Sequence, residues 1–244
     1  MQTYKQKVTS VDDTALPESQ EDLFADERYI IYYPFVGTLF KNHFDKNNFK
    51  YSQDHIFLLT VFFSDLYYHY KVGNTQKNKL FFQTMSQYKK RIGFNRSQID
   101  TIHSFCKKLG DVYIYTGVRR RSEYFLKNSM INYINSERKK EKKFGIKFYP
   151  KLNNITNGNI RYTVILSYFL HLDSVFEGKI IKSYKDISKE TLIPIKSVRS
   201  CVNFLLNRKL IKIEHGQNKN SYQCNKQKIL NLAQMPQRSK IVSI

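Results

Sequence analysis

Arginine, lysine and amide side chains at predicted turns and helix starts are the residues of this sequence best suited to chemistry, and the chemistry they suit is anion binding. Arg119, Arg120 and Arg121 stand between two strand-like segments, residues 112–115 and 123–126, which predicts the tip of a hairpin. Three adjacent guanidinium groups repel one another, and a row of phosphates or a narrow minor groove offsets that repulsion. A solvated loop is the alternative. The sequence therefore predicts a polyanion contact at this hairpin.

Two predicted helices carry further candidates opposite an apolar stripe. The first helix runs from a cap at Asn95 to about Lys108, and the second spans residues 196–209. Asparagine and glutamine can bind the edge of adenine, and arginine the edge of guanine. Every soluble helix has a polar outer face, so it is the basic surroundings that favour the functional interpretation. The residues expected to face base edges are Arg96, Ser97, Gln98, Asp100 and Thr101 on the first helix and Lys196, Ser197, Arg199, Ser200 and Asn203 on the second.

A second set of side chains is expected to contact the sugar-phosphate backbone. Some follow the capping pattern Thr84-Met85-Ser86-Gln87 on a short helix that should end at Gly93. Others occupy the C-terminal parts of the two longer helices or the loop of a second hairpin, residues 215–220. The set comprises Lys89, Lys90, Arg91, Lys107, Lys108, Asn207, Arg208 and Lys219.

Catalytic and metal-binding patterns are missing from the sequence. The nine glycines form no phosphate-binding loop, and no HExxH motif or cysteine–histidine cluster occurs. The six histidines are better explained as structural or surface residues, and 18 tyrosines are too many to select a nucleophile. We expect no catalytic residue, no metal and no cofactor. Cys106 and Cys201 could form a redox switch, but packing of a helix face is the simpler explanation.

The charge distribution indicates a polyanionic partner. The 244 residues carry 41 lysines and arginines against 20 acids, a net charge of +21. Residues 1–28 hold seven acids and three bases, which leaves 38 bases and 13 acids, a net charge of +25, for residues 29–244. A basic domain of this kind attracts nucleic acid. The acidic segment either competes with DNA for the basic surface or acts as a solubilising tail.

A membrane partner and an oxidising compartment are not indicated. The longest apolar run, residues 56–63 broken by Thr60, is far shorter than the roughly 18 residues that span a bilayer. The N-terminus shows neither a signal peptide nor an amphipathic basic helix or lipid anchor. The cysteines, Cys106, Cys201 and Cys224, form no CxxC pair. We therefore expect a cytoplasmic protein without a membrane contact.

The elements that would position the candidate residues are expected twice, in the same order. The first copy consists of a buried helix at 52–71, a short strand at 80–82, a short helix to Gly93, the helix from Asn95 and the hairpin at 112–126. The second copy consists of a buried helix at 161–172, a capping pattern at Ser183 and Asp186, a turn at Pro194, the helix at 196–209 and strands at 210–213 and 221–224. Between the copies, the charge run 137–143 either ends a helix that begins near Asn128 or forms a solvated linker.

Similar residues recur between the copies at an offset near one hundred, as expected after an ancient duplication. Only the chemical class of each position is kept. In this alignment Gln98 is matched with Val198 and Asp100 with Ser200. The residues expected to contact bases therefore differ between the two helices, which predicts two unequal half-sites. The matches are Tyr32-Tyr33-Pro34 with Phe148-Tyr149-Pro150, Ser64 with Ser167, Lys79-Leu80-Phe81 with Lys179-Ile180-Ile181, Arg96-Ser97 with Lys196-Ser197, and Ile102, Phe105, Cys106 and Lys108 with Val202, Leu205, Leu206 and Arg208.

This order of elements resembles the winged-helix superfamily over most of residues 29–232. In that superfamily the helix after the turn enters the major groove and the hairpin, or wing, touches phosphates or the minor groove. The resemblance implies an α+β, mainly helical fold with two winged helix-turn-helix domains in tandem, an internal duplication in which a monomer mimics a homodimer. The implied segments are an acidic mobile arm (1–28), a first winged-helix domain (29–136), a basic linker (137–147), a second winged-helix domain (148–232) and a C-terminal tail (233–244).

The tandem arrangement, the size and an AT-rich coding bias are similar to accessory DNA-binding proteins of Gram-positive conjugative plasmids. That resemblance implies a double-stranded DNA-binding protein of a mobile element, which binds two imperfect half-sites near a transfer origin or promoter. Its partners would include other proteins of a transfer complex with type IV secretion, or of a replication complex. A plasmid or phage replication initiator with two winged helices is one alternative. A protein-docking module of a secretion or replication machine is the other.

Overall fold

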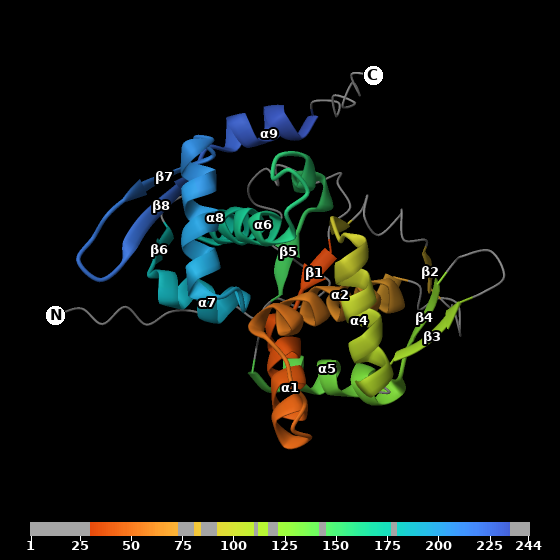
Figure 1. Ribbon diagram of the computed structural model, residues 1–244. Coiled ribbons are helices and arrows are strands. Elements are labelled where there is room, and N and C mark those ends of the chain that lie inside the picture. Colours follow the sequence, from red (N-terminus) through yellow and green to blue (C-terminus); the bar gives the residue numbers. More distant parts are fainter. Residues whose placement is uncertain are drawn as a thin grey trace.

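The fold is α+β and mainly helical, as predicted (Figure 1). The computed structural model describes residues 30–72, 81–83, 92–109, 112–116, 122–141, 145–176 and 180–234. The expected acidic arm, residues 1–28, lies outside these ranges. Among the described helices, none combines the length and the apolar character needed to cross a membrane.

The first half is built around a helix that is buried on almost every face. Residues 56–67 of α2 are all buried, because apolar side chains occupy nearly the whole circumference of the helix. Pro34 opens α1 at a position where a helix needs no N–H donor. The three-stranded sheet has the order β2-β4-β3. The elements are β1 (Ile30–Tyr32), α1 (Pro34–Lys46), α2 (Gln53–Val72), β2 (Phe81–Gln83), α4 (Arg96–Leu109), β3 (Val112–Thr116), β4 (Ser122–Leu126) and α5 (Asn128–Glu141).

The second half repeats this order with two differences: a 3-10 turn takes the place of α1, and α7 stands between β6 and α8, where the described part of the first half has no helix. Its sheet has the corresponding order β6-β8-β7. The buried helix α6 again has apolar side chains on nearly all faces. The elements are β5 (Ile146–Phe148), η1 (Pro150–Asn154), α6 (Ile160–Val175), β6 (Ile180–Lys182), α7 (Tyr184–Thr191), α8 (Ile195–Asn207), β7 (Ile211–Glu214), β8 (Asn220–Cys224) and α9 (Lys226–Gln234).

Polar caps begin the helices where the sequence indicates them. The predicted capping box of α7 is confirmed: Ser183 Oγ accepts from Asp186 N at 3.0 Å, and Asp186 Oδ2 accepts from Ser183 N at 3.0 Å. These hydrogen bonds from the backbone and side chain of Ser183 hold the pKa of Asp186 below its usual value. Asn159 caps α6 by accepting from the N–H groups of Arg161 and Tyr162. Each cap satisfies backbone N–H groups of the first helical turn and so fixes where its helix begins.

A two-stranded ribbon joins the halves, and the sequence did not indicate it. Strands β1 and β5 are antiparallel, with Ile30 opposite Phe148, Ile31 opposite Lys147 and Tyr32 opposite Ile146. If Ile30-Ile31-Tyr32 is matched with Ile146-Lys147-Phe148, exchanging the halves reproduces the same register. This is the pairing that a two-fold axis between Ile31 and Lys147 would generate.

A shared hydrogen bond supports the predicted match between the lead-in segments and the buried helices. Tyr33 N donates to Ser64 Oγ at 3.0 Å in the first half, and Tyr149 N donates to Ser167 Oγ at 3.3 Å in the second. All four residues are buried. Ser64 and Ser167 therefore occupy equivalent positions, as the sequence match predicted, and each accepts a hydrogen bond from the equivalent backbone N–H group.

The alignment of α4 with α8 needs a correction of one residue. Phe81 pairs with Tyr124 and Ile180 with Tyr222, so β2 and β6 correspond at an offset of 99, not 100. The same offset aligns the left-handed residues Gly93 and Leu192 before the helices. It also aligns the first-turn bonds, because Ile99 N donates to Asn95 O and Val198 N to Pro194 O.

The sequence match was wrong because it followed side-chain class alone. Two adjacent apolar residues, Cys201 and Val202, are buried in α8, so the apolar stripe fits at either offset. Backbone hydrogen bonds remove this ambiguity. Ile99 therefore corresponds to Val198, Asp100 to Arg199 and Thr101 to Ser200.

The turns that precede α4 and α8 each pack against the opposite half. Tyr32 Oη donates to Thr191 O at 2.6 Å, and a Cβ on Gly37 would collide with Leu192 Cδ1. In the reverse direction, a Cβ on Gly93 would stand 3.0 Å from Gly158 O. The buried apolar side chains of both halves form one core.

The structure also assigns the segments expected to flank the second half. Of the two alternatives for the charge run, the end of a helix is confirmed for residues 137–141, which complete α5. Residues 146–147 of the expected linker belong to β5, and residues 233–234 of the expected tail belong to α9. The two ends of the expected linker are therefore parts of regular elements.

Candidate nucleic-acid interface

The outer face of α8 carries a continuous polar stripe. Lys196, Arg199, Ser200 and Asn203 are exposed, and Ser197 is half-buried, whereas Val198, Cys201, Val202 and Leu205 are buried on the opposite face. From residue 196 to residue 203 a helix rises about 10 Å, the length of roughly three base-pair steps. The structure thus places all five residues predicted on this helix along its outer or flanking surface.

Helix α7 and the turn after it hold α8 in place. Ser188 Oγ donates to Ile193 O at 2.7 Å, which ties α7 to the turn. Arg199 lies with its guanidinium carbon 5.8 Å from the centre of the Tyr184 ring. Leu192 ends α7 in the left-handed conformation, with φ of 59°. These contacts set the orientation of the stripe.

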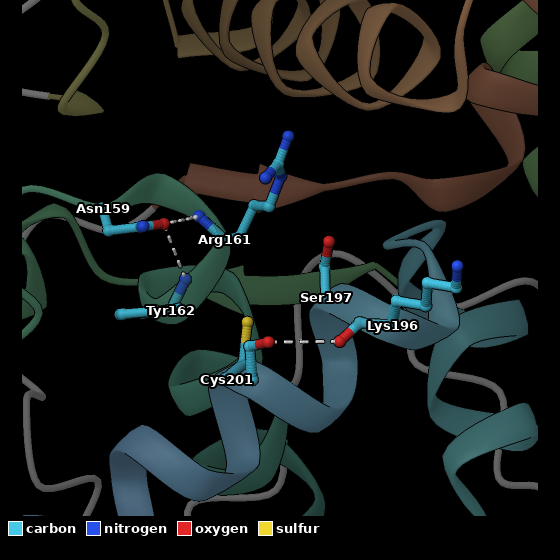
Figure 2. A pocket seen from close by; sticks show the side chains of 7 residues that line it. Asn159, Arg161, Tyr162, Lys196, Ser197 and Cys201 are labelled. Carbon is cyan, nitrogen blue, oxygen red and sulfur yellow. Dashed lines mark hydrogen bonds between the residues drawn. The ribbon is translucent and has the colours of Figure 1, made fainter.

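A surface pocket of about 300 Å³ opens beside the start of α8 (Figure 2). Arg161 and Lys196 supply its charges, and no acidic residue lines it. Asn159 Oδ1 is occupied by the N–H groups of α6, so it offers no free acceptor there. Pro194 gives α8 no side-chain cap. The charge of Arg161 is paired with Asp54 of the other half, so among the described residues Lys196 supplies the unpaired positive charge beside the helix N-terminus, an environment that favours anions.

The outer face of α4 is engaged in contacts within its own helix. Arg96 Nε lies 3.8 Å from Asp100 Oδ2, with side chains 86% and 62% exposed. Gln98 forms a capping box with Asn95, with both bonds at 2.9 Å. Thr101 Oγ donates to Ser97 O at 2.9 Å. The residues predicted on α4 lie on its outer or flanking surface, where Arg96, the Gln98 side-chain oxygen and the Thr101 hydroxyl already have partners within the helix or its cap.

The cations at the C-terminal ends of the two helices differ in their surroundings. Lys107 and Lys108 are exposed in the last turn of α4. Arg208 is half-buried: its guanidinium donates to Ile155 O at 2.8 Å and to Asn157 Oδ1 at 3.4 Å, and it lies 5.2 Å from the centre of the Phe204 ring. The predicted role of Arg208 in DNA binding stays a prediction, and the contacts described fasten the end of α8 to the loop after η1.

The second hairpin places a lysine near the start of α7. Lys219 is exposed in the loop between β7 and β8. After the hydrogen bonds from Ser183, its positive charge contributes to the lowered pKa of Asp186, which locates the lysine near that carboxylate. A Cβ on Gly216 would collide with Lys219 O, so this turn requires glycine. The second hairpin therefore places its loop lysine near the N-terminal turn of α7.

Six of the predicted cations lie outside the described residues. They are Lys89, Lys90, Arg91, Arg119, Arg120 and Arg121. The hairpin that was predicted around the three arginines is confirmed, because β3 and β4 pair with Thr116 opposite Ser122. The contact between these arginines and a polyanion stays a prediction.

Sequence reasoning missed Asn159, Arg161 and Tyr162 as parts of this surface. Arg161 was recognised only as the start of a buried helix, yet its side chain is half-buried and its guanidinium pairs with Asp54 Oδ2 of the other half at 2.6 Å. An asparagine directly before an apolar run is a capping signal, and Asn159 has that position. The sequence carried no signal for the contact across the halves.

The described part of the chain contains no group of histidine, cysteine and acidic residues that could hold a metal ion. The three cysteines are buried, and none of them forms a disulfide with another described residue. Burial raises the pKa of Cys201 to about 12, which keeps this thiol protonated at neutral pH. Comparisons with protein-family models, curated proteins and solved structures give no match to this chain.

Proposed function

We propose that the chain is a double-stranded DNA-binding protein in which two winged helix-turn-helix domains act in tandem. Each described half contains a buried helix, a short strand, a reading helix and a hairpin, and the two sheets have corresponding strand orders. In a winged helix the second helix of the helix-turn-helix enters the major groove. By this correspondence α4 and α8 are the recognition helices, and β3–β4 and β7–β8 are the wings.

The β1–β5 register is the observation that carries the proposal. Its symmetry supports an internal duplication whose halves face each other as the subunits of a two-fold dimer do. In Figure 1, α4 and α8 run in opposite directions on either side of this ribbon. Opposed recognition helices suit two half-sites about one turn of B-DNA apart, roughly 34 Å.

The charge and the exposed side chains favour DNA as the partner. The net charge is +21. The polar stripe of α8 exposes Lys196 and Arg199, and Asn203 follows one helical turn after Arg199. These residue types bind guanine and adenine edges in the major groove. We propose a cytoplasmic role on a mobile element, near a transfer origin or promoter, as an accessory of conjugative transfer or a repressor.

Selection of bound duplexes followed by hydroxyl-radical footprinting tests the proposal. A single chain should protect two imperfect half-sites about one helical turn apart on the same face of the DNA. Affinity should fall steeply between 50 and 200 mM salt, by about 10³-fold or more if six or more phosphates are contacted. A single short protected segment, or a flat response to salt, would contradict it.

Other outcomes of the same experiment identify the alternatives. Direct repeats bound by several protomers would indicate a replication initiator. Replacement of Arg119, Arg120 and Arg121 by alanine should weaken binding to the selected duplex, with the exposed Lys127→Ala change as a single-charge control. Unchanged DNA binding in the triple variant, with loss of binding to another protein of the machine, would indicate a docking module.

A further inference from the structure

The two recognition helices carry opposite charges at one structurally equivalent position. With the offset of 99 fixed by the backbone, Asp100 of α4 occupies the place that Arg199 has in α8. Both residues are exposed, one turn from the start of the helix. A carboxylate at this place repels the phosphates and the acceptor-rich groove edge that a guanidinium attracts.

The neighbouring side chains on α4 reinforce this difference. Arg96 is drawn to Asp100 at 3.8 Å, and the amide oxygen of Gln98 is used by the capping box. On α8, the side chains of Lys196 and Asn203 are exposed, and among the described residues neither is held by a hydrogen bond or an ion pair. Arg199 contacts only the face of a ring among the described residues, which leaves its N–H donors free. A polar group without a partner costs less to engage at a DNA edge than one that must first leave a partner.

We infer that the second half reads the sequence of the DNA site and that Asp100 holds the first half to a weak, positioning contact. This inference rests on the proposed DNA binding and specifies it. Lys196 and Arg199 suit guanines, and Asn203, one turn further along, suits an adenine. The strong half-site should therefore be rich in guanine on one strand and lie under α8. The weak half-site should tolerate most sequences, with the exposed pair Lys107 and Lys108 on its backbone.

The test removes the two opposite charges with the same substitution. Asp100→Asn and Arg199→Asn each place an asparagine at the equivalent position of one helix. Arg199→Asn should weaken binding of the selected duplex about 10- to 100-fold, the loss typical of one bidentate base contact. Asp100→Asn should strengthen binding about two- to five-fold, the range of an exposed charge interaction. It should also deepen protection of the weak half-site in the footprint.

Matched controls correct for the change in net charge. Lys127→Asn and Asp45→Asn remove one exposed charge of each sign outside the two helices and both hairpin loops. Each should change affinity less than two-fold, and circular dichroism should show that all four variants fold. Fluorescence anisotropy of labelled duplexes carrying one scrambled half-site then locates the effect. Scrambling the half-site under α8 should abolish the difference between Arg199→Asn and the unaltered chain.

Equal losses in the Asp100→Asn and Arg199→Asn variants would overturn the inference and leave the proposed function standing, because they would mean that both helices read bases. Strengthening confined to the half-site under α8 would overturn it too. If the unaltered chain fails to prefer any duplex sequence, the proposed function itself fails, and the inference fails with it.

Discussion

At the scale of single residues, burial of titratable side chains makes stability depend on pH. Burial lowers the pKa of His171 to about 4, and the nearby positive charge of Lys147 adds to this shift. The unfolded chain has a histidine pKa near 6.5. Between these values the unfolded state binds the extra proton, so stability decreases as pH falls from about 6.5 to about 4.

The prediction for His171 is a change in the pH profile. The free energy of unfolding should fall by no more than about 1.4 kcal/mol per pH unit through this window because of His171. Urea unfolding of the unaltered chain and of His171→Gln, measured from pH 7.5 to 4, checks this. The difference between the two should depend on pH. Parallel profiles would show that His171 is not the titrating group, and His103, whose pKa burial also lowers, would be the next residue to replace.

At the scale of elements, the turn before α8 is held by the first half of the chain. Leu192 adopts a left-handed backbone conformation that costs a non-glycine residue about 1–2 kcal/mol. Its side chain occupies the space that a side chain at Gly37 would fill. Gln53 Nε2 also donates to Leu192 O at 3.0 Å. The packing of Leu192 on the other half is what keeps this strained residue in place.

A double-mutant cycle tests that packing. Gly37→Ala should destabilise the protein because its methyl group meets both Leu192 Cδ1 and Thr60 Oγ1. Leu192→Ala should cost about 2–5 kcal/mol if the site cannot collapse. The double variant should lose less than the sum of the two, by about 0.5–3 kcal/mol, because one clash is gone.

The matched control pairs Gly37→Ala with Ile229→Ala, a buried residue on α9. Figure 1 shows α9 far from α1, so the costs of this pair should add. Thermal and urea unfolding give all the values. Strict additivity of Gly37→Ala and Leu192→Ala would contradict the packing described.

Sequence patterns predicted the elements better than their relationships. Ser183 and Asp186 gave the cap of α7, and the alternation around residues 112–126 gave the hairpin, because both depend on neighbours in the chain. The β1–β5 ribbon could not be predicted, since three-residue strands depend on a partner more than a hundred residues away. For the same reason the sequence could not distinguish an offset of 99 from one of 100. The offset decides which residue of α4 is equivalent to Arg199.

At the scale of the whole molecule, the halves share one hydrophobic core. Tyr32 bonds to Thr191 O and Arg161 to Asp54, so each half completes the packing of the other. Independent domains would separate without exposing such contacts. We therefore expect one cooperative transition on heating, in spite of the repeated architecture.

Differential scanning calorimetry measures this directly. The calorimetric and van't Hoff enthalpies of unfolding should agree, as they do for a two-state transition. Tyr32→Phe, which removes the bond to Thr191 O, should lower the transition temperature without splitting the peak. Two resolved peaks in the unaltered chain would show that the halves unfold separately.

The ribbon between the halves has a further consequence for how the protein would sit on a duplex. In a dimer of identical chains, Ile31 would pair with a second Ile31, and the two-fold axis would make the two ends of the assembly identical. Here Ile31 faces Lys147, and the two arms of the molecule differ. A bound chain would therefore point in one direction along the double helix, so that a single copy could mark polarity on the DNA.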